Sequence, residues 1–157
     1  FVVTIYLKLV MDQDKTHSQD REAPVKAPRT FRPGTRILLA EDNELNREIV
    51  KELLSLCGLE ITCAANGREA VELFEENPPG TFGLILMDIQ MPVMNGYEAA
   101  RRIRKSTHPQ AGSIRIIAMS ANTFSDDVHA ALESGMNAHV GKPIDMDVLA
   151  DVLSAVL

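Results

Sequence analysis

The stretch LILMDIQMPVMNG, residues 84–96, places one carboxylate directly after a run of apolar residues. Residues 84–87 are all apolar and are typical of a buried strand, and Asp88 follows them. A carboxylate at the end of a buried strand is costly to desolvate unless something at the strand tip requires it. Asp88 is therefore the first candidate for a functional residue, and its role depends on which other charged groups reach the same place.

Apolar strands and amphipathic helices alternate on both sides of this stretch, from residue 36 to the end of the chain. Strands that alternate with helices form parallel sheets that are covered on both faces. The predicted fold class is therefore α/β, with a five-stranded parallel sheet in an alternating (βα)5 arrangement. The strands are expected at residues 37–40, 59–64, 82–87, 114–119 and 138–140, and the helices at 45–57, 67–77, 97–105, 126–134 and 145–156.

Three helices carry patterns that predict which side faces the core. The apolar stripe of the first helix comprises Leu45, Ile49, Leu53, Leu54 and Leu56. In the second helix the inward residues are Ala70, Val71 and Phe74. The charged run at 101–105, Arg-Arg-Ile-Arg-Lys, is interpreted as a solvated helix face.

The 157 residues divide into three parts by composition. Residues 1–10, FVVTIYLKLV, alternate apolar and polar side chains and are interpreted as a remnant strand of a preceding domain. Residues 11–34 are polar, charged and rich in proline, which indicates a flexible linker. Residues 35–157 contain the whole strand and helix pattern and are expected to form the folded domain.

Charge and cysteine content restrict the function further. Residues 33–157 hold ten Lys/Arg against eighteen Asp/Glu, a net charge of −8, which argues against nucleic-acid binding. No span has the length of apolar sequence that crosses a bilayer, so no direct membrane contact is expected. Cys57 and Cys63 are interpreted as reduced, buried thiols, and we expect this part of the protein in the cytoplasm.

Polar residues follow four of the five predicted strands. The carboxyl ends of parallel strands form the binding edge of such a sheet. Carboxylates that converge there repel one another unless a cation lies between them, and Mg²⁺ prefers such oxygen ligands together with phosphate oxygens. A lysine and a hydroxyl group could bind the same phosphate. This set favours an aspartyl-phosphate intermediate on Asp88, and its members are Glu41, Asp42, Asp88, Ser120 and Lys142.

Four motifs in this order resemble the receiver domain of two-component response regulators. They are EDN at 41–43, MDIQMPVMNG at 87–96, AMSAN at 118–122 and HVGKPI at 139–144. The resemblance covers residues 36–157 and implies a flavodoxin-like strand order, 2-1-3-4-5. The wider wording is most similar to C-terminal receivers of hybrid histidine kinases, and residues 1–10 resemble the last strand of a kinase ATP-binding domain.

The resemblance implies a role for each matching residue. Asp88 would be the phosphoacceptor, and Mg²⁺ would be held by Glu41, Asp42, Asp88 and the main-chain carbonyl of Gln90. Ser120 and Lys142 would bind the phosphoryl group.

The remaining implied roles concern the switch and the lifetime of the phosphorylated state. Ser120 and His139 would form the switch, although the position of His139 is more commonly Tyr or Phe. An alternative is that His139 is a partly exposed strand residue with no part in signalling. Gln90 and Asn122 would tune dephosphorylation, and the bond before Pro143 would be cis.

The implied partner is the phosphohistidine of a histidine kinase or of a histidine phosphotransfer domain. The module itself would catalyse its own phosphoryl transfer and hydrolysis, and the full-length chain would be a histidine kinase. Two alternatives stay open: a stand-alone response regulator, and a receiver-like binding module that is not phosphorylated. A haloacid dehalogenase-type phosphatase is disfavoured because Gln90 stands where that class has a second acid. A flavodoxin is disfavoured because the acidic loop at 41–46 would repel a phosphate.

Overall fold

The computed structural model describes residues 31–121 and 125–157, which fold around one parallel sheet of five strands in the order β2-β1-β3-β4-β5. The predicted fold class and strand order are confirmed. The strands are β1 (Arg36–Ala40), β2 (Glu60–Ala64), β3 (Leu84–Asp88), β4 (Arg115–Ser120) and β5 (Ala138–Gly141). The helices are α2 (Glu44–Leu56), α3 (Gly67–Glu76), α4 (Gly96–Lys105), α5 (Ser125–Glu133) and α6 (Met146–Val156).

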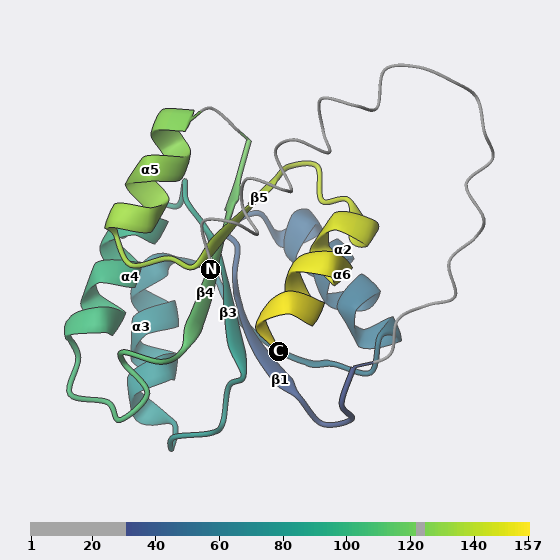
Figure 1. Cartoon of the computed structure of the whole chain (residues 1–157), viewed down its shortest axis with the longest axis horizontal. Coiled ribbons are helices and arrows are strands. Elements are labelled where there is room, and N and C mark those ends of the chain that lie inside the picture. Colours follow the sequence, from purple (N-terminus) through teal and green to yellow (C-terminus); the bar gives the residue numbers. More distant parts are fainter. Residues whose placement is uncertain (1–30, 122–124) are drawn as a thin grey trace.

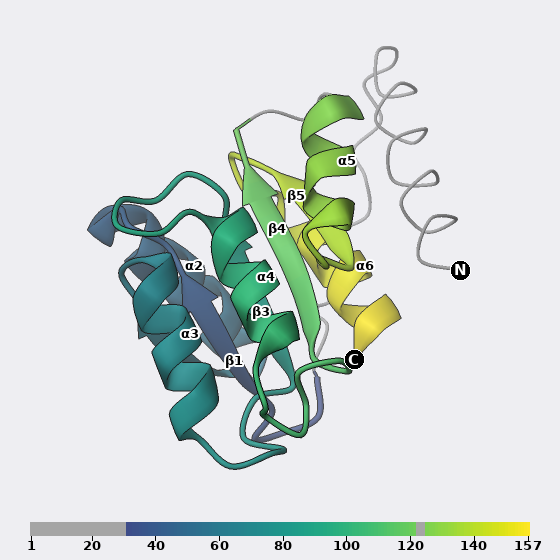
Figure 2. The ribbon, with the colours of Figure 1, turned by 90° about the vertical axis from the view of Figure 1, so that its left-hand side faces the viewer.

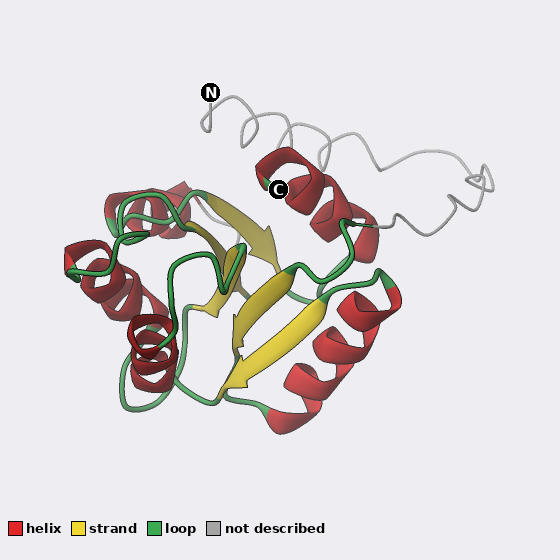
Figure 3. Ribbon diagram, turned by 90° about the horizontal axis from the view of Figure 1, so that it is seen from below, coloured by secondary structure: helices red, strands yellow, loops and turns green. Residues whose placement is uncertain are grey.

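The sheet lies between two layers of helices. Helices α2 and α6 cover one face, and α3, α4 and α5 cover the other (Figure 1 and Figure 3). Figure 2 shows the second layer from outside, with α3, α4 and α5 side by side across the strands. Each face has its own cluster of buried apolar side chains, because successive strand residues point to opposite faces. Both faces of the central strands are therefore buried beneath apolar side chains.

The functional strand ends are themselves part of the sheet. Asp88 is the last residue of β3 and pairs with Met119 of β4, and Ser120 closes β4 opposite Gly141. The sequence pattern placed Asp88 and Ser120 just beyond their strands. Ladder hydrogen bonds extend one residue further than the apolar runs, so the main chain of both residues is fixed by the sheet.

The predicted apolar stripe of α2 is wrong in part. Leu45, Ile49 and Leu56 are exposed, with relative exposures of 69%, 47% and 78%. The buried residues of this helix are Val50 and Leu54. Only a narrow strip of α2 meets the sheet, and the leucines beside it face outwards. By contrast, the predicted inward residues of α3 are buried, namely Ala70, Val71 and Phe74.

Side-chain caps set where four of the helices begin. Asn43, Asn66 and Asn95 accept hydrogen bonds from main-chain N–H groups in the first turns of α2, α3 and α4, and Asp145 does so for α6. The caps of α2 and α4 come soon after the ends of β1 and β3. This arrangement keeps the loops at the carboxyl edge of the sheet short and ordered.

The N-terminal predictions fall mostly outside the described residues, namely the strand at 1–10 and the linker as far as residue 30. The described end of the linker contacts the domain, since the Phe31 N–H donates to the carbonyl of Cys57 at 3.2 Å and the Phe31 ring packs against the cluster beneath α2 and α6. Cys57 and Cys63 are free thiols. Among the described helices, none combines the length and apolar character needed to cross a bilayer.

Candidate functional site

Three carboxylates meet at the carboxyl edge of the sheet. Glu41 directly follows β1, Asp42 comes next, and Asp88 ends β3. One oxygen from each lies within 4.8 Å of the others. Glu41 and Asp88 are buried, whereas Asp42 is exposed. The structure therefore brings together the three acids that the sequence placed at strand ends, with one of them open to solvent.

Lys142 lies between the two buried acids. Its Nζ is 2.7 Å from Oε2 of Glu41 and 3.1 Å from Oδ2 of Asp88. The Lys142 main-chain N–H donates to the carbonyl of Ser120 at 2.8 Å, and the Lys142–Pro143 peptide bond is cis. Burial lowers the pKa of Lys142, but the hydrogen bonds to Glu41 and Asp88 outweigh it and the net pKa is raised. Lys142 is therefore a fixed cation at the edge of the site.

Every hydrogen-bonding group of Glu41 is occupied. Its N–H donates to the carbonyl of Ala64 on β2, and its carbonyl accepts from Nη1 of Arg47 at 2.9 Å. Its Oε1 accepts from the N–H of Asn43 at 3.2 Å, and its Oε2 accepts from Lys142. A buried carboxylate needs such partners to remain charged. Glu41 is consequently held rigidly on all sides.

Asp88 has an electrostatic environment that disfavours its ionised form. Burial and, next, the charge of Glu41 raise the pKa of Asp88 from 3.8 to about 6, while Lys142 and the Gln90 N–H act in the opposite direction. That N–H donates to Oδ1 at 3.3 Å. Asp88 is thus a rigidly held carboxylate that would gain from a cation beside it.

The loop after Asp88 folds back closely against the main chain of Asp88. A Cβ atom at Gly96 would collide with the main-chain oxygen of Asp88, so only glycine fits the start of α4. The Gly96 N–H donates to the carbonyl of Ile89 at 2.9 Å. At the tip of the loop, Val93 has a φ of 69° and a side chain that is 75% exposed. Such a φ is strained for a β-branched residue.

The other residues of the implied site lie as follows. Ser120 is buried at the end of β4, and the Gln90 side chain is exposed. His139 is 7% exposed on β5, in register with Ala118 of β4. Burial of His139 contradicts the partial exposure in that alternative, and its part in signalling stays a prediction. Asn122 lies outside the described residues.

An apolar groove runs from the acidic edge along α2. It has a volume of about 200 Å³ and lies between α2 and the loop that follows β5. Its polar end contains Glu41, Asn46 and Lys142, and its apolar wall contains Ile49, Val50, Leu53, Pro143 and Ile144. The exposed side chains of Leu45 and Ile49 extend this apolar surface outwards.

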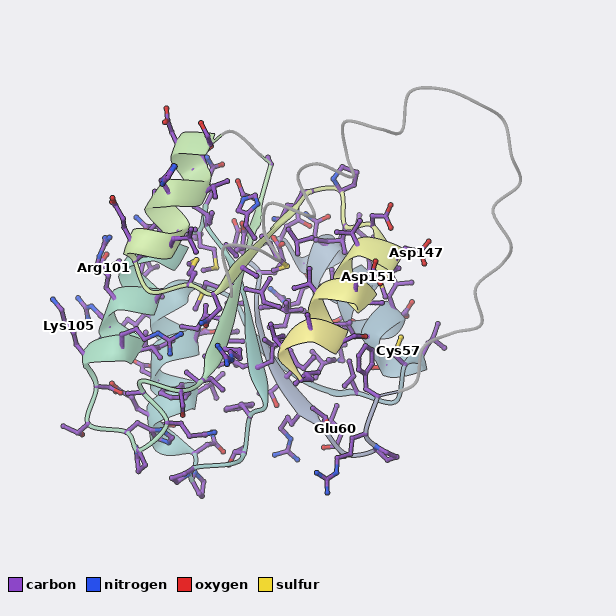
Figure 4. The ribbon with its side chains drawn as sticks, viewed as in Figure 1. Cys57, Glu60, Arg101, Lys105, Asp147 and Asp151 are labelled. Atoms are coloured by element: carbon purple, nitrogen blue, oxygen red, sulfur yellow. The ribbon has the colours of Figure 1, made fainter. Side chains whose placement is uncertain are left out.

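The basic run of α4 is mostly the solvated face that its sequence indicates. Arg101 and Lys105, labelled in Figure 4, point away from the sheet on the outer side of α4. Arg104 departs from this expectation. Its Nε, Nη1 and Nη2 donate to the carbonyls of Gly135 and Ala111 and to Oδ1 of Asn137, at 2.9, 2.9 and 2.8 Å.

Sequence reasoning missed the contributions of Arg47, Asn43 and Gly96 to the site. The Asn43 cap could have been found from its place before an amphipathic run. The glycine in the motif at 87–96 also signals a close approach. No comparable signal marks Arg47, because an arginine on a helix is ordinary.

The donor set fits a hard divalent cation. It offers three carboxylate oxygens within 4.8 Å of one another, and one of the acids is exposed to solvent, so the cation could retain water ligands. An aspartate that ends a strand beside such a set, with a lysine at 3.1 Å, is arranged for nucleophilic attack on an electrophile that carries negative charge.

Comparison with known proteins finds close similarity to one family. Residues 37–154 match the family model described as "Response regulator receiver domain". The chain is 39% identical over 121 residues, 76% of its length, to "Hybrid signal transduction histidine kinase I" of Dictyostelium discoideum. It is 35% identical over 128 residues, 79% of its length, to the peroxide stress-activated histidine kinase of Schizosaccharomyces pombe. The chain spans only 7% and 8% of the lengths of these two relatives.

Solved structures give the same result. The receiver domain of a sensor histidine kinase from Pseudomonas aeruginosa, which has a magnesium ion coordinated in its active site cleft, is 34% identical with a TM-score of 0.70, covering 78% of this chain and 97% of that one. A receiver domain of Saccharomyces cerevisiae, crystallised with a histidine phosphotransfer protein, is 32% identical with a TM-score of 0.69, covering 79% of this chain and 89% of that one.

Proposed function

The chain belongs to the response regulator receiver domain family, and from this premise we propose that Asp88 accepts a phosphoryl group from a phosphohistidine. An oxygen of Asp88 attacks the phosphorus atom, and the bond between phosphorus and the imidazole nitrogen breaks. The electron pair of that bond stays on the nitrogen. The products are an aspartyl phosphate and a histidine. The convergence of Asp88, Glu41, Asp42 and Lys142 on one strand edge carries this proposal.

Glu41, Asp42 and Asp88, with the main-chain carbonyl of Gln90, would hold Mg²⁺. When bound, the ion neutralises charge on phosphoryl oxygens and on the crowded acids. The raised pKa of Asp88 supports this assignment, because burial and Glu41 leave its carboxylate short of positive charge. Among the described residues, this is the group of acids whose oxygens lie close enough together to share an ion.

Lys142 and Ser120 would bind the phosphoryl group after transfer. Lys142 already lies 3.1 Å from the acceptor oxygen, and its main-chain N–H is tied to the carbonyl of Ser120. A movement of Lys142 towards a phosphoryl oxygen therefore acts on the ends of β4 and β5 together. We propose that this is the first step of the switch, with His139 on β5 as its second member.

The lifetime of the aspartyl phosphate would depend on Gln90 and Asn122. Both carry side-chain amides that can hold or orient the water molecule that hydrolyses the acyl phosphate. Gln90 is exposed and two residues from Asp88, which supports a place beside the path of that water.

The donor would be a histidine-bearing helical domain that docks on the exposed face of α2. Leu45 and Ile49 are 69% and 47% exposed, and the groove beside them ends at Glu41 and Lys142. Solvated apolar side chains of this size favour a protein contact. The yeast receiver crystallised with a histidine phosphotransfer protein supports a donor of this class. We also propose that the chain is part of a hybrid histidine kinase, as its curated relatives are.

Labelling with a small phosphodonor tests the acceptor. Acetyl phosphate and Mg²⁺ should add one phosphoryl group to the parent protein, detected by intact mass, and the group should be lost in hydroxylamine. Asp88→Asn should not be labelled. Glu75→Gln, which changes an exposed acid on α3, should be labelled like the parent. Equal labelling of Asp88→Asn and the parent would place the acceptor elsewhere, and labelling of neither the parent nor the control would contradict the proposed function.

A further inference from the structure

We infer that Arg47 is a positioning residue for the acidic pair Glu41–Asp42 and thereby sets the affinity of the site for Mg²⁺. This inference rests on the proposed function, in which these acids hold the ion. Arg47 is the fourth residue of α2, at the end of its first turn, and is half-buried. Its Nη1 donates to the main-chain carbonyl of Glu41 at 2.9 Å.

The argument begins with Asp42, the exposed member of the acidic set. Within residues 31–121 and 125–157, its carboxylate makes no hydrogen bond and no ion pair, in contrast to Glu41 and Asp88. The direction of the Asp42 side chain is therefore set by the main chain on either side of it.

Two interactions hold that stretch of main chain. On one side, the carbonyl of Glu41 belongs to the same planar peptide as the N–H of Asp42, so a hydrogen bond to this carbonyl fixes the orientation of the whole peptide plane. Arg47 makes that bond. On the other side, Asn43 caps α2 and its N–H donates to Oε1 of Glu41. Without Arg47, the peptide between Glu41 and Asp42 keeps only the second restraint.

The bond from Arg47 is charge-assisted and closes a ring of contacts. The ring runs from the carbonyl of Glu41 through the guanidinium group to the main chain of Arg47, whose N–H donates to the carbonyl of Asn43 at 2.9 Å. Burial raises the pKa of the Cys63 thiol on β2, and the positive charges of Lys51 and, next, Arg47 act against that rise. The hydrogen bond to the Glu41 carbonyl joins α2 to the residue that follows β1, and this contact restrains the guanidinium.

Two effects of Arg47 on a bound cation have opposite signs, and this makes the inference testable. As a nearby positive charge, Arg47 repels Mg²⁺, so its removal would tighten binding. As a positioning residue it preorganises the acidic pair, so its removal would weaken binding. Partners that orient metal ligands from the second layer typically change metal affinity by about 10- to 100-fold. We expect about tenfold weakening, since Arg47 acts through the main chain.

The test compares Mg²⁺ dissociation constants of the unphosphorylated protein, measured by NMR titration of main-chain amides. Arg47→Met should bind Mg²⁺ about tenfold more weakly than the parent, the lower end of the range for such partners. Arg102→Met is the matched control, because it removes an exposed arginine of α4 and changes the net charge equally. The control should bind like the parent.

A second readout uses the protein without Mg²⁺. The amide resonances of Asp42 and Asn43 should shift in Arg47→Met and stay in place in Arg102→Met. If Arg47→Met does not fold, Arg47→Gln takes its place, with the same expected result, because its side chain is two bonds shorter and does not reach the Glu41 carbonyl. Unchanged or tighter Mg²⁺ binding overturns the inference alone. Absence of Mg²⁺ binding in the parent overturns the proposed function as well.

Discussion

The ammonium nitrogen of Lys142 lies 2.7 Å from a carboxylate oxygen of Glu41, closer than the 3.1 Å that separates it from a carboxylate oxygen of Asp88. Glu41 is 1% exposed and has all its polar groups bonded, so it anchors the lysine firmly. Asp88 receives only part of the charge compensation that one lysine can give to two buried acids. The electrostatic imbalance therefore falls on Asp88, the proposed phosphoacceptor.

The first prediction follows from that imbalance and concerns pH. In the folded, metal-free protein the pKa of Asp88 is raised from 3.8 to about 6, mainly by burial and next by the negative charge of Glu41. Between those values the folded protein holds a proton that the unfolded chain has released, so stability falls as pH rises from about 4 to about 6. We expect Asp88→Asn to be more stable than the parent at pH 7, with a difference that shrinks towards pH 4.

Urea unfolding in EDTA, followed by circular dichroism at several pH values, measures that difference. Glu75→Gln, which changes an exposed acid, should give no comparable gain at pH 7. A constant difference between Asp88→Asn and the parent at every pH would contradict the prediction.

The second prediction separates docking from chemistry. Ile49→Glu puts a charge on the wall of the groove beside Lys142, and Leu56→Glu puts the same charge at the far end of α2. Both parent side chains are exposed, so neither change should unfold the protein. Phosphotransfer from a phosphorylated histidine phosphotransfer domain should slow at least about tenfold in Ile49→Glu, which corresponds to about 1.4 kcal/mol. Leu56→Glu should resemble the parent, and acetyl phosphate should label all three proteins equally. Equal slowing by both variants would argue for a general charge effect instead.

The third prediction concerns the inward-facing arginine of α4. Arg104 links α4 to the turn after α5, to the loop before β4 and to Asn137, whose side chain also accepts from the N–H of Ile116. Arg104→Met leaves the carbonyls of Gly135 and Ala111 without their side-chain donor and removes one of the two donors to Oδ1 of Asn137, and we expect a loss of about 3 kcal/mol in the free energy of unfolding. Arg102 is exposed and pairs with Glu98 one turn away, so Arg102→Met should lower the free energy of unfolding by less than about 1 kcal/mol. Similar losses for the two arginines in urea unfolding would refute the difference in their roles.

The fourth prediction concerns Val93, at the strained tip of the loop that follows Asp88. Val93 has a φ of 69°, and the N–H of Met94 donates across it to the carbonyl of Pro92 at 2.7 Å. Glycine adopts this conformation without steric cost, so Val93→Gly should raise the free energy of unfolding by about 1 kcal/mol after the entropy cost of glycine is included. Val93→Ala retains a Cβ atom and should gain less. An Ala variant at least as stable as the Gly variant would show that φ is not the cause.

The convergence of charged residues at one edge of the sheet could be predicted from the sequence, because it follows from the topology of the sheet. Parallel strands bring their carboxyl ends to one edge, so the acids that follow β1 and end β3 were expected to meet the lysine after β5 once the alternation of strands and helices was established. The same reasoning could not predict which of the two buried acids lies closer to Lys142. That Lys142 lies closer to Glu41 than to Asp88 depends on side-chain packing within the edge.

The face of α2 could not be predicted because its sequence is apolar on more than one side. One apolar side of the helix contains Val50 and Leu54, and another contains Leu45, Ile49 and Leu56. A helix that packs against a sheet buries only a narrow strip, so only one of these sides can face the core. The bond from Arg47 to the Glu41 carbonyl was equally hidden, since a main-chain acceptor leaves no mark in the sequence. This contact of Arg47 was therefore found only from the coordinates.

The last prediction concerns His139, which is buried on β5 in register with Ala118. Its strand neighbours Ala138 and Val140 belong to the cluster beneath α2 and α6, so His139 faces the layer of α3, α4 and α5. If this ring moves inwards when Ser120 binds a phosphoryl group, protonation should oppose the movement, because burial of a charged imidazole is costly. The response of β4 and α5 to the phosphoryl mimic beryllium fluoride with Mg²⁺ should then weaken as pH falls through the range in which imidazoles titrate. NMR shifts of Ser120 and His139, recorded across a pH series that keeps the complex saturated, measure that response. His139→Phe carries no titrating ring, so its response should be the same at every pH. Either of two results would exclude His139 from the switch: a response of the parent that does not depend on pH, or a full response in His139→Ala.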